Sequence, residues 1–353
     1  MGCSVSASSC PSHLSNPKLA TPINPWLIVR DRAWRWMRKG NCSMSFLVEL
    51  DRGAFPDNAL AAFAPTSQFK LDNARAMMWL SQLAYETGGR PKVESILTAW
   101  HLTMHAFASN DPVTGLPPHS ACVVVAGGAG ATFVAFSGTD PLKIEDWITD
   151  FSAAPSACGL HSGFQDAVGT VWPLIKMAIE NRPASEQPLF FTGHSLGGAL
   201  AIVAAGRANS ELNVQATAVY TFGSPRTGGQ LFFDSYTPQL GNLTFRLVHG
   251  TDIVPTVPFS RVDTFRHVGR SLQCPTDGRF DEQTTMAAAA EDNPNLVGDA
   301  LLSGLADISA LAALRPAHAL GPGPLDQLAG ILPRMVRDHV PKNYFRALSI
   351  TLP

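Results

Sequence analysis

The sequence has no long apolar run and few charged side chains. No stretch reaches the roughly 18 apolar residues that a membrane-spanning helix requires, so no such helix is expected. Charged residues make up 15% of the 353 positions and hydrophobic residues 45%, so the chain can bury a large core. The formal net charge of −2 lacks the basic excess typical of a nucleic-acid-binding protein, and it suits a substrate with little or no charge.

The cysteines are few and scattered. The six of them form no CxxC pair and no spacing typical of metal ligands, so we expect no metal and no other cofactor. Cys122 lies in the apolar run ACVVVAG and is predicted to be a buried thiol. A disulfide between Cys158 and Cys274 is an alternative to free thiols at these two positions.

The N-terminus has no apolar segment typical of a secretory signal. We therefore expect a protein that stays inside the cell, leaves without a leader, or has lost its leader. The start MGCSVS fits an N-myristoylation pattern, with Gly2 and Ser6 in the required places and Cys3 available for palmitoylation. A plain unstructured leader is the interpretation that we favour.

Three parts of the chain differ in pattern. Residues 1–43 are expected to form a poorly patterned N-terminal arm, followed by one domain over 44–353. Within that domain, 271–335 is rich in Ala, Leu, Gly and Pro and contains the apolar helical run NLVGDALLSGLADISALAALRP. We interpret 271–335 as a helical insertion and not as a separate domain.

Helical and strand patterns alternate along the domain. Helices are expected over 69–87, 91–108 and 164–182. The apolar runs ACVVVAG and ATFVAFSG, joined by GGAG, predict a hairpin. Further on, the strands PLFFTG, VQATAVYTFGS and TFRLVHG alternate with helices such as ALAIVAAGRA. This alternation predicts an α/β fold with a mostly parallel sheet covered by helices on both faces.

The strongest motif is TGHSLGGAL at 192–200, which contains G-x-S-x-G between a strand and a helix. This is the context of a nucleophile elbow, in which a strained turn exposes Ser195 at the carboxyl edge of the sheet. Gly193 and Gly197 let the strand and the helix approach closely. A serine that only caps the helix is the alternative, and the flanking strand disfavours it.

Two backbone N–H groups are expected to stabilise the oxyanion that forms during acyl transfer. One belongs to Leu196, the residue after the nucleophile. The other is expected from Thr139, because FSGTD lies at the end of the strand ATFVAFSG, where a second donor is placed in this fold.

The acid of a catalytic triad follows the nucleophile and precedes the base in this fold. Asp252 lies on the loop after the strand LTFRLV, which is the expected place. Asp234 and Asp263 are the competitors, and neither directly follows a strand.

The base must be one of three later histidines. His339 lies near the end of the chain, where the last loop usually brings the base, and spacing favours it over His267. His318 has no supporting pattern. The carboxylate of Asp252 would hold the imidazole in the tautomer that accepts the Ser195 proton, so we expect activity to rise with pH as the imidazole becomes neutral.

Taken together, seven segments resemble the class 3 lipase family, which includes the filamentous-fungal triacylglycerol lipases. In chain order they are FSGTD, IEDWITDF, HSGF, GHSLGGAL, TFGSPRTGG, TDIVPTVP and DHVPKNYF. The resemblance extends over about 70–345, apart from most of 271–335. It implies an α/β-hydrolase fold.

The resemblance also implies roles for individual residues. It implies a triad of Ser195, Asp252 and His339, oxyanion donors at Thr139 and Leu196, and structural roles for His194 and His267. The segment after the oxyanion loop resembles the family's lid, with Ile144, Trp147 and Ile148 as candidate substrate contacts. Two departures affect this region: Ser137 stands where the family has Arg, and two extra residues separate Thr139 from Ile144.

The implied function is hydrolysis of carboxylic esters through an acyl-enzyme, in particular of triacylglycerols at a lipid–water interface. Phospholipase A1 and feruloyl or short-chain esterase activities are alternatives on the same fold. A catalytically inactive binding protein and a peptidase are rival classes, which the intact triad and the lack of a peptide-binding feature disfavour. The insertion at 271–335 is either a second cap over the acyl site or a helical pair on the flank of the domain.

Overall fold

The computed structural model describes seven stretches of the chain: 49–86, 89–109, 121–139, 159–258, 265–283, 287–288 and 334–352. Several predictions fall outside these stretches. They are the N-terminal arm with Gly2, Cys3 and Ser6, the candidate lid residues Ile144, Trp147 and Ile148, the competitors Asp263 and His318, Cys158, and most of the insertion at 271–335.

The described strands form one eight-stranded sheet whose spatial order equals the order along the chain. Strands β3 to β7 are parallel, whereas β1–β2–β3 and β7–β8 pair antiparallel. The strands are β1 (Thr103–Ala108), β2 (Val123–Gly128), β3 (Ala131–Phe136), β4 (Leu189–His194), β5 (Ala218–Phe222), β6 (Thr244–His249), β7 (Arg270–Cys274) and β8 (Ala287–Ala288). Strands β3 to β6 are buried along their whole length, as expected for a parallel sheet with both faces covered.

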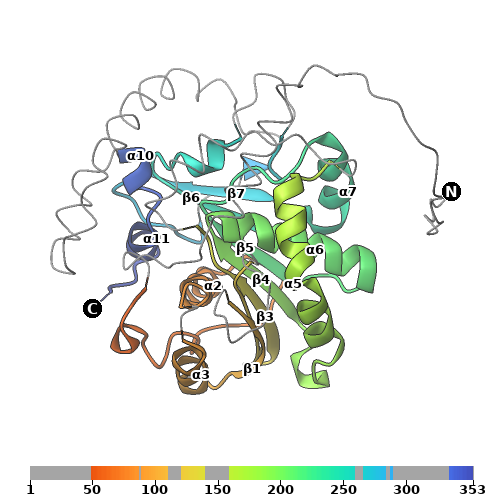
Figure 1. Cartoon of the computed structure of the whole chain (residues 1–353). Coiled ribbons are helices and arrows are strands. Elements are labelled where there is room, and N and C mark those ends of the chain that lie inside the picture. Colours follow the sequence, from red (N-terminus) through yellow and green to blue (C-terminus); the bar gives the residue numbers. More distant parts are fainter. Residues whose placement is uncertain are drawn as a thin grey trace, which may run out of the picture.

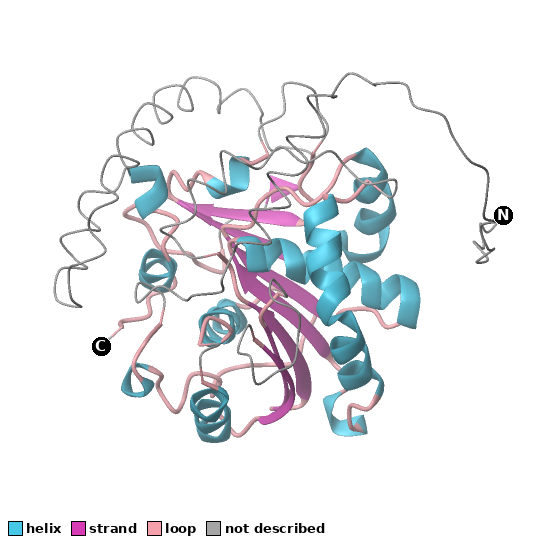
Figure 2. Ribbon diagram, viewed as in Figure 1, coloured by secondary structure: helices cyan, strands magenta, loops and turns pink. Residues whose placement is uncertain are grey.

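Helices cover the two faces of this sheet (Figures 1 and 2). On one face lie α2 (Leu71–Leu83), α3 (Arg90–Ala99) and α11 (Pro341–Ala347); on the other lie α5 (Ser162–Glu180), α6 (Leu196–Leu212) and α7 (Gln230–Leu240). Short elements complete the described set: α10 (Arg334–Arg337), η1 (Arg52–Ala54), η4 (Ala184–Glu186), η5 (Gly241–Leu243) and η6 (Val254–Thr256). Each face has its own apolar core, one built around α5 and α6 and the other around α2 and α3.

Most of the predicted elements are confirmed. The hairpin through GGAG is β2–β3, and the strands and helices around the G-x-S-x-G motif follow the expected order. The sheet is mostly parallel, so the predicted α/β class is correct. None of the helices in the described stretches is both long and apolar enough to cross a bilayer.

The helix predicted over 91–108 is wrong in its second half. Helix α3 ends at Ala99, and β1 follows as an edge strand paired with β2. His101 adopts a positive φ of 58°, and the amide of Leu102 donates to the carbonyl of Leu97 at 2.8 Å, which closes the helix end. Pairing with β2 therefore overrides the helical spacing of the sequence.

Two further expectations need correction. The segment after Arg270 forms strand β7 beside β6, so the first residues of the predicted insertion belong to the sheet. Cys274 is a free and buried thiol, so the alternative disulfide with Cys158 is wrong. Cys122 is a buried thiol, as predicted.

Candidate active site

Ser195 lies in a tight turn between β4 and α6, at the carboxyl edge of the sheet. Its φ of 59° and ψ of −132° fall outside the regions that residues with a side chain normally occupy. The strained backbone is held because the amide of Ser195 donates to the carbonyl of Phe222, at the end of the adjacent strand, at 2.8 Å. Such local strain is typical of a functional position.

Two glycines make this turn possible. A Cβ atom on Gly193 would lie 2.2 Å from the carbonyl carbon of Gly197, so only glycine lets the strand pass beneath the helix. A Cβ atom on Gly197 would lie 2.4 Å from the carbonyl oxygen of Phe136. The first turn of α6 therefore packs directly on the end of β3, and this contact brings the FSGTD segment next to Ser195.

The predicted oxyanion donors lie beside the nucleophile. A Cβ atom on Gly138 would lie 2.9 Å from Cβ of Ser195, and Thr139 follows directly. Leu196 is the first residue of α6, so its N–H has no carbonyl partner inside the helix and is free to bind a substrate oxygen. The positive end of the helix dipole points to the same place.

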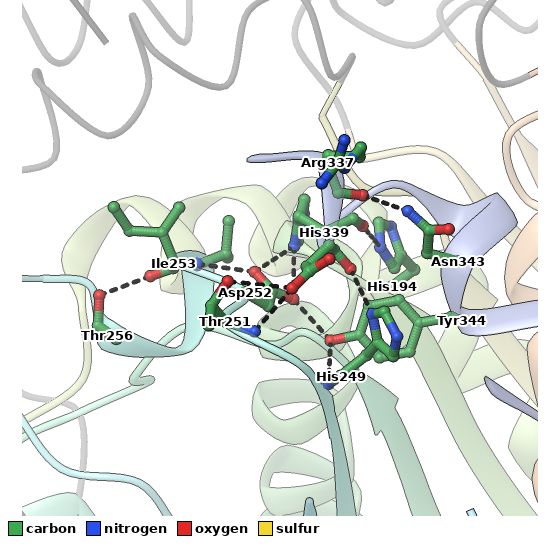
Figure 3. A network of polar contacts seen from close by, with 12 residues as sticks. His194, His249, Thr251, Asp252, Ile253, Thr256, Arg337, His339, Asn343 and Tyr344 are labelled. Carbon is green, nitrogen blue, oxygen red and sulfur yellow. Dashed lines mark hydrogen bonds and ion pairs between the residues drawn. The ribbon is translucent and has the colours of Figure 1, made fainter. Parts of the chain in front are cut away.

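Asp252 and His339 form a buried pair (Figure 3). Nδ1 of His339 lies 2.8 Å from Oδ1 and 2.9 Å from Oδ2 of Asp252, and both side chains are solvent-excluded. A carboxylate can only accept, so Nδ1 carries the hydrogen and Nε2 of the neutral ring presents its lone pair. Oγ of Ser195 and Nε2 of His339 are buried, and neither has a hydrogen-bond partner among the described residues.

Gly223, from the TFGSPRTGG segment, leaves the space that this pair occupies. It has a positive φ of 59°, and a Cβ atom there would lie 2.5 Å from Oδ2 of Asp252 and 2.9 Å from Nδ1 of His339. The ends of three neighbouring strands therefore meet here: β4 leads to Ser195, β5 to Gly223, and β6 to the loop with Asp252.

Tyr344 is a partner of the acid that the sequence analysis did not assign. Its hydroxyl donates to Oδ2 of Asp252 at 2.6 Å and accepts from the amide of His249 at 3.2 Å. Burial and the neighbouring carboxylate raise the pKa of Tyr344 well above its ordinary value, so the phenol keeps its proton and remains a donor. The tyrosine of the DHVPKNYF segment was visible in the sequence, but only the fold shows what it contacts.

His194 lies inside the elbow and uses both of its ring nitrogens. Nε2 donates to the carbonyl of His339 at 2.7 Å, so Nδ1 accepts from the hydroxyl of Tyr85 at 2.8 Å. Burial, with a smaller effect of His339, lowers the pKa of His194 well below its ordinary value. A neutral ring with both nitrogens engaged has none left for Ser195.

The rival candidates lie elsewhere. Nε2 of His267 donates to the carbonyl of Pro255 at 2.7 Å, and burial lowers the pKa of His267 well below its ordinary value. Asp234 lies on the exposed side of α7 and accepts from Gln230. The structure thus places His339, and not His267, against Asp252. Within the described stretches, no group of three or more His, Cys, Asp or Glu side chains is arranged to hold a metal ion.

This fold and this constellation define a class. A mostly parallel sheet, a strained serine at a strand-to-helix turn and a buried Asp–His pair on later loops are the features of an α/β-hydrolase with a Ser-His-Asp site. Comparison with known proteins agrees: residues 133–262 match the family described as lipase (class 3), which confirms the resemblance predicted from the motifs.

Known sequences and structures place the chain beside lipases. A secreted mono- and diacylglycerol lipase of Fusarium solani is 37% identical over 125 residues, which are 33% of this chain and 37% of that protein. A triacylglycerol lipase of Arabidopsis thaliana is 26% identical over 47% of this chain and 40% of its own length, and a lipase of Caenorhabditis elegans is 30% identical over 57% of this chain and 60% of its own length. The chain thus spans between about a third and three fifths of these relatives.

Solved structures share the fold. The triacylglyceride lipase of Rhizomucor miehei superposes with a TM-score of 0.51 and 20% identity, covering 65% of this chain and 91% of that one. A triacylglycerol lipase whose catalytic centre is described as a serine protease triad superposes with a TM-score of 0.50 and 21% identity, covering 65% and 89%. The α/β-hydrolase fold predicted from the sequence is therefore confirmed.

Proposed function

We propose that the protein is a serine hydrolase of carboxylic esters, and more narrowly a triacylglycerol lipase. The observation that carries the proposal is the buried Asp252–His339 pair together with the strained Ser195: Nε2 of His339 and Oγ of Ser195 are both buried, and neither has a hydrogen-bond partner among the described residues. A purely structural role of Ser195 does not explain why its buried hydroxyl is held in a strained turn without a hydrogen bond.

Acylation begins when Nε2 of His339 takes the proton of Ser195 while Oγ attacks the ester carbonyl. Asp252 keeps the ring in the required tautomer and stabilises the imidazolium that forms. The N–H groups of Leu196 and Thr139 stabilise the oxyanion, and loss of one such donor costs about 2.7–4 kcal/mol of barrier. The imidazolium then protonates the leaving alcohol. In the second half of the reaction, His339 takes a proton from water, the water oxygen attacks the acyl-enzyme, and the imidazolium returns the proton to Oγ of Ser195 as the acid is released.

Ser195→Ala should abolish turnover, by about a thousandfold or more, and leave the fold intact. The measurement is hydrolysis of tributyrin together with labelling by a fluorophosphonate, which should modify Ser195 in the native chain. Folded native protein that hydrolyses no ester and takes up no label at Ser195 would overturn the proposal in favour of a binding protein.

The choice of base has its own test. His339→Ala should remove activity, whereas His267→Gln, at an equally buried histidine outside the site, should keep turnover per folded molecule within about threefold. The opposite result would show that the base is misassigned, while the fluorophosphonate label on Ser195 would still identify a serine hydrolase.

A second substrate class has a specific observation in its favour. The relative that is 37% identical is named a mono- and diacylglycerol lipase, so partial glycerides compete with triacylglycerols as the substrate. A panel of triolein, diolein, phosphatidylcholine and a feruloyl ester separates these activities from phospholipase A1 and feruloyl esterase.

The candidate lid belongs to the same proposal. We expect Ile144, Trp147 and Ile148 to contact the lipid interface or the acyl chain. Trp147→Ala should then lower turnover of emulsified tributyrin more than turnover of a soluble short-chain ester. An equal loss on both substrates would assign Trp147 to the core.

A further inference from the structure

A second, partly buried polar network lies beside the Asp252–His339 pair and is not used by the proposed mechanism. Its members are His249 at the end of β6, Asp338 next to the base, and Thr251 and Thr276 on two adjoining loops. His249 and Asp338 are solvent-excluded. The network therefore connects the loop that carries the acid with the segment that carries the base.

The carboxylate of Asp338 joins the two loops. Its Oδ2 atom accepts from the amide of Thr251 at 2.8 Å, from the hydroxyl of Thr251 at 3.0 Å and from the hydroxyl of Thr276 at 2.8 Å. Gly250 makes room for it, since a Cβ atom there would lie 2.2 Å from Oδ2. Thr251 directly precedes Asp252, and Asp338 directly precedes His339, so this carboxylate fixes the acid loop to the base segment.

His249 contacts the same segment through its ring. Nδ1 lies 3.1 Å from the carbonyl oxygen of Asp338, and Nε2 lies 2.9 Å from the carbonyl oxygen of Thr276. Carbonyl oxygens only accept, whereas a neutral imidazole has one N–H, so only the doubly protonated ring satisfies both contacts. The carbonyl of Asp338 belongs to the peptide bond that leads into His339.

Two histidines thus contact the backbone at the proposed catalytic base, one at each of two consecutive carbonyls. His194 donates to the carbonyl of His339, and His249 donates to the carbonyl just before it (Figure 3). His194 does so as a neutral ring, because its other nitrogen accepts from Tyr85. His249 needs its second proton to hold the carbonyls of Asp338 and Thr276 together.

Several titratable and charged groups surround His249. Two charged groups lie near the ring: the carboxylate of Asp338, and the guanidinium of Arg346, which donates to the same carbonyl of Thr276 at 2.6 Å. Cys274 on β7 is the register partner of His249 on β6, and its thiol stays neutral because burial raises the pKa of Cys274 to about 11. The ring of Tyr344 packs edge-on at 5.8 Å and separates His249 from Asp252.

We propose that His249 is a positioning residue that holds the base segment in place while its ring is doubly protonated. When the ring loses one proton, a nitrogen lone pair faces a carbonyl oxygen in place of an N–H group. The backbone that leads into His339 is then held less firmly. Activity should then fall on the alkaline side, in addition to the rise on the acid side that a neutral His339 requires. The expected effect on activity rests on the proposed function, whereas the doubly protonated state of His249 does not.

The test combines a pH profile with a direct view of the ring. His249→Gln should lower kcat by about tenfold at the pH optimum and remove the alkaline fall, because a glutamine side chain does not titrate. His267→Gln is the matched control, since that ring is also buried but contacts a single carbonyl, that of Pro255. The control should keep the alkaline fall.

Asp338→Asn is a second variant that tests the same proposal if His249→Gln does not fold. Without the carboxylate the doubly protonated ring loses its favourable charge, so the alkaline fall should move to lower pH. Nitrogen-15 NMR of the ring, assigned by its disappearance in the His249 variant or its shift in the Asp338 variant, should show two N–H groups at the pH of highest activity.

A His249 ring with a single N–H throughout the active pH range overturns the proposal. So does an alkaline fall that is unchanged in His249→Gln and in Asp338→Asn. If fluorophosphonate never labels Ser195, the proposed function fails, while the NMR result still decides whether His249 is doubly protonated.

Discussion

At the scale of single residues, Gly223 is a position where the Asp252–His339 pair leaves no room for a side chain. A Cβ atom there would meet the acid and the base, and also the hydroxyl of Tyr344 at 2.9 Å. Gly223→Ala should lower kcat by about a hundredfold, because a displacement of about 1 Å between reacting groups is enough for such a loss. The measurement is tributyrin turnover per folded molecule.

Gly130→Ala provides the matched control. Gly130 also has a positive φ, of 76°, but its nearest neighbour is Cγ of Pro65 at 3.8 Å, far from Asp252. Both substitutions should cost about 1–2 kcal/mol of unfolding free energy through the backbone alone. If Gly223→Ala loses stability like the control yet keeps its activity, the glycine does not shape the Asp–His pair.

Tyr344 offers a second test at this scale. Tyr344→Phe removes the hydrogen bond to Oδ2 of Asp252, and a bond to a charged group contributes about 1.5–3 kcal/mol. We expect kcat to fall by about tenfold, because the acid is then less firmly oriented toward His339. Steady-state kinetics on a soluble ester measure the effect.

Tyr236→Phe distinguishes orientation from general stability. Tyr236 is also buried, and its hydroxyl contacts Oγ1 of Thr244 at 2.8 Å, away from the site. This variant should lose about 1 kcal/mol of stability and keep its kcat. Equal kinetic losses in the two variants would mean that Tyr344 acts only on stability.

The residues that the sequence identified are those whose role depends on local geometry. Ser195 is recognisable because a strand, a tight turn and a helix are contiguous in the chain. The contacts of Tyr344, His194 and His249 join positions that lie far apart in the sequence, and no spacing rule predicts them. For that reason the sequence indicated the triad but not the groups that position it.

At the scale of elements, the contact between α6 and the end of β3 brings together the two segments that carry the proposed oxyanion donors. Gly197→Ala would place a Cβ atom 2.4 Å from the carbonyl oxygen of Phe136, so helix and strand must separate. Overpacking of this kind costs about 1–3 kcal/mol, and the shift of Thr139 relative to Ser195 should lower kcat by about a hundredfold. Thermal unfolding and ester turnover measure the two effects.

Gly169→Ala is the control within a neighbouring helix. Gly169 lies inside α5, and its nearest neighbour is a guanidinium nitrogen of Arg207 at 3.8 Å. This substitution should stabilise the protein by about 0.5–1 kcal/mol and leave turnover unchanged. Unchanged activity in Gly197→Ala as well would show that the oxyanion donors do not depend on this contact.

Elements were predictable where periodicity and burial agree. The core strands β3 to β6 are short apolar runs bounded by helices or turns, and the sequence predicted them. The error at 91–108 arose because the residues of β1 retain helical spacing, and only the neighbouring β2 makes them a strand. Strand β7 was missed because its five residues include two exposed positions and lie at the start of a segment of different composition.

At the scale of the whole molecule, three buried histidines connect stability to pH. Burial lowers the pKa of His161 from 6.5 to about 3, and it lowers the pKa values of His194 and His267 well below their ordinary value. A folded state with depressed histidine pKa values binds fewer protons than the unfolded chain. The contribution of these three histidines to the free energy of unfolding should therefore be fully present above pH 6.5 and decrease as the pH falls below that value.

His161 allows this dependence to be measured away from the site. Its ring packs against Phe164 with centroids 4.4 Å apart, so His161→Phe keeps an aromatic ring there and removes the titration. Between pH 6.5 and about 3, the unfolding free energy of the variant should change less steeply with pH than that of the native protein. The difference in slope should be up to about 1.4 kcal/mol per pH unit. His101→Asn, at an exposed position with positive φ, is the control and should keep the native slope. Urea unfolding at several pH values gives both slopes, and a native slope in His161→Phe would mean that His161 is protonated in the folded protein.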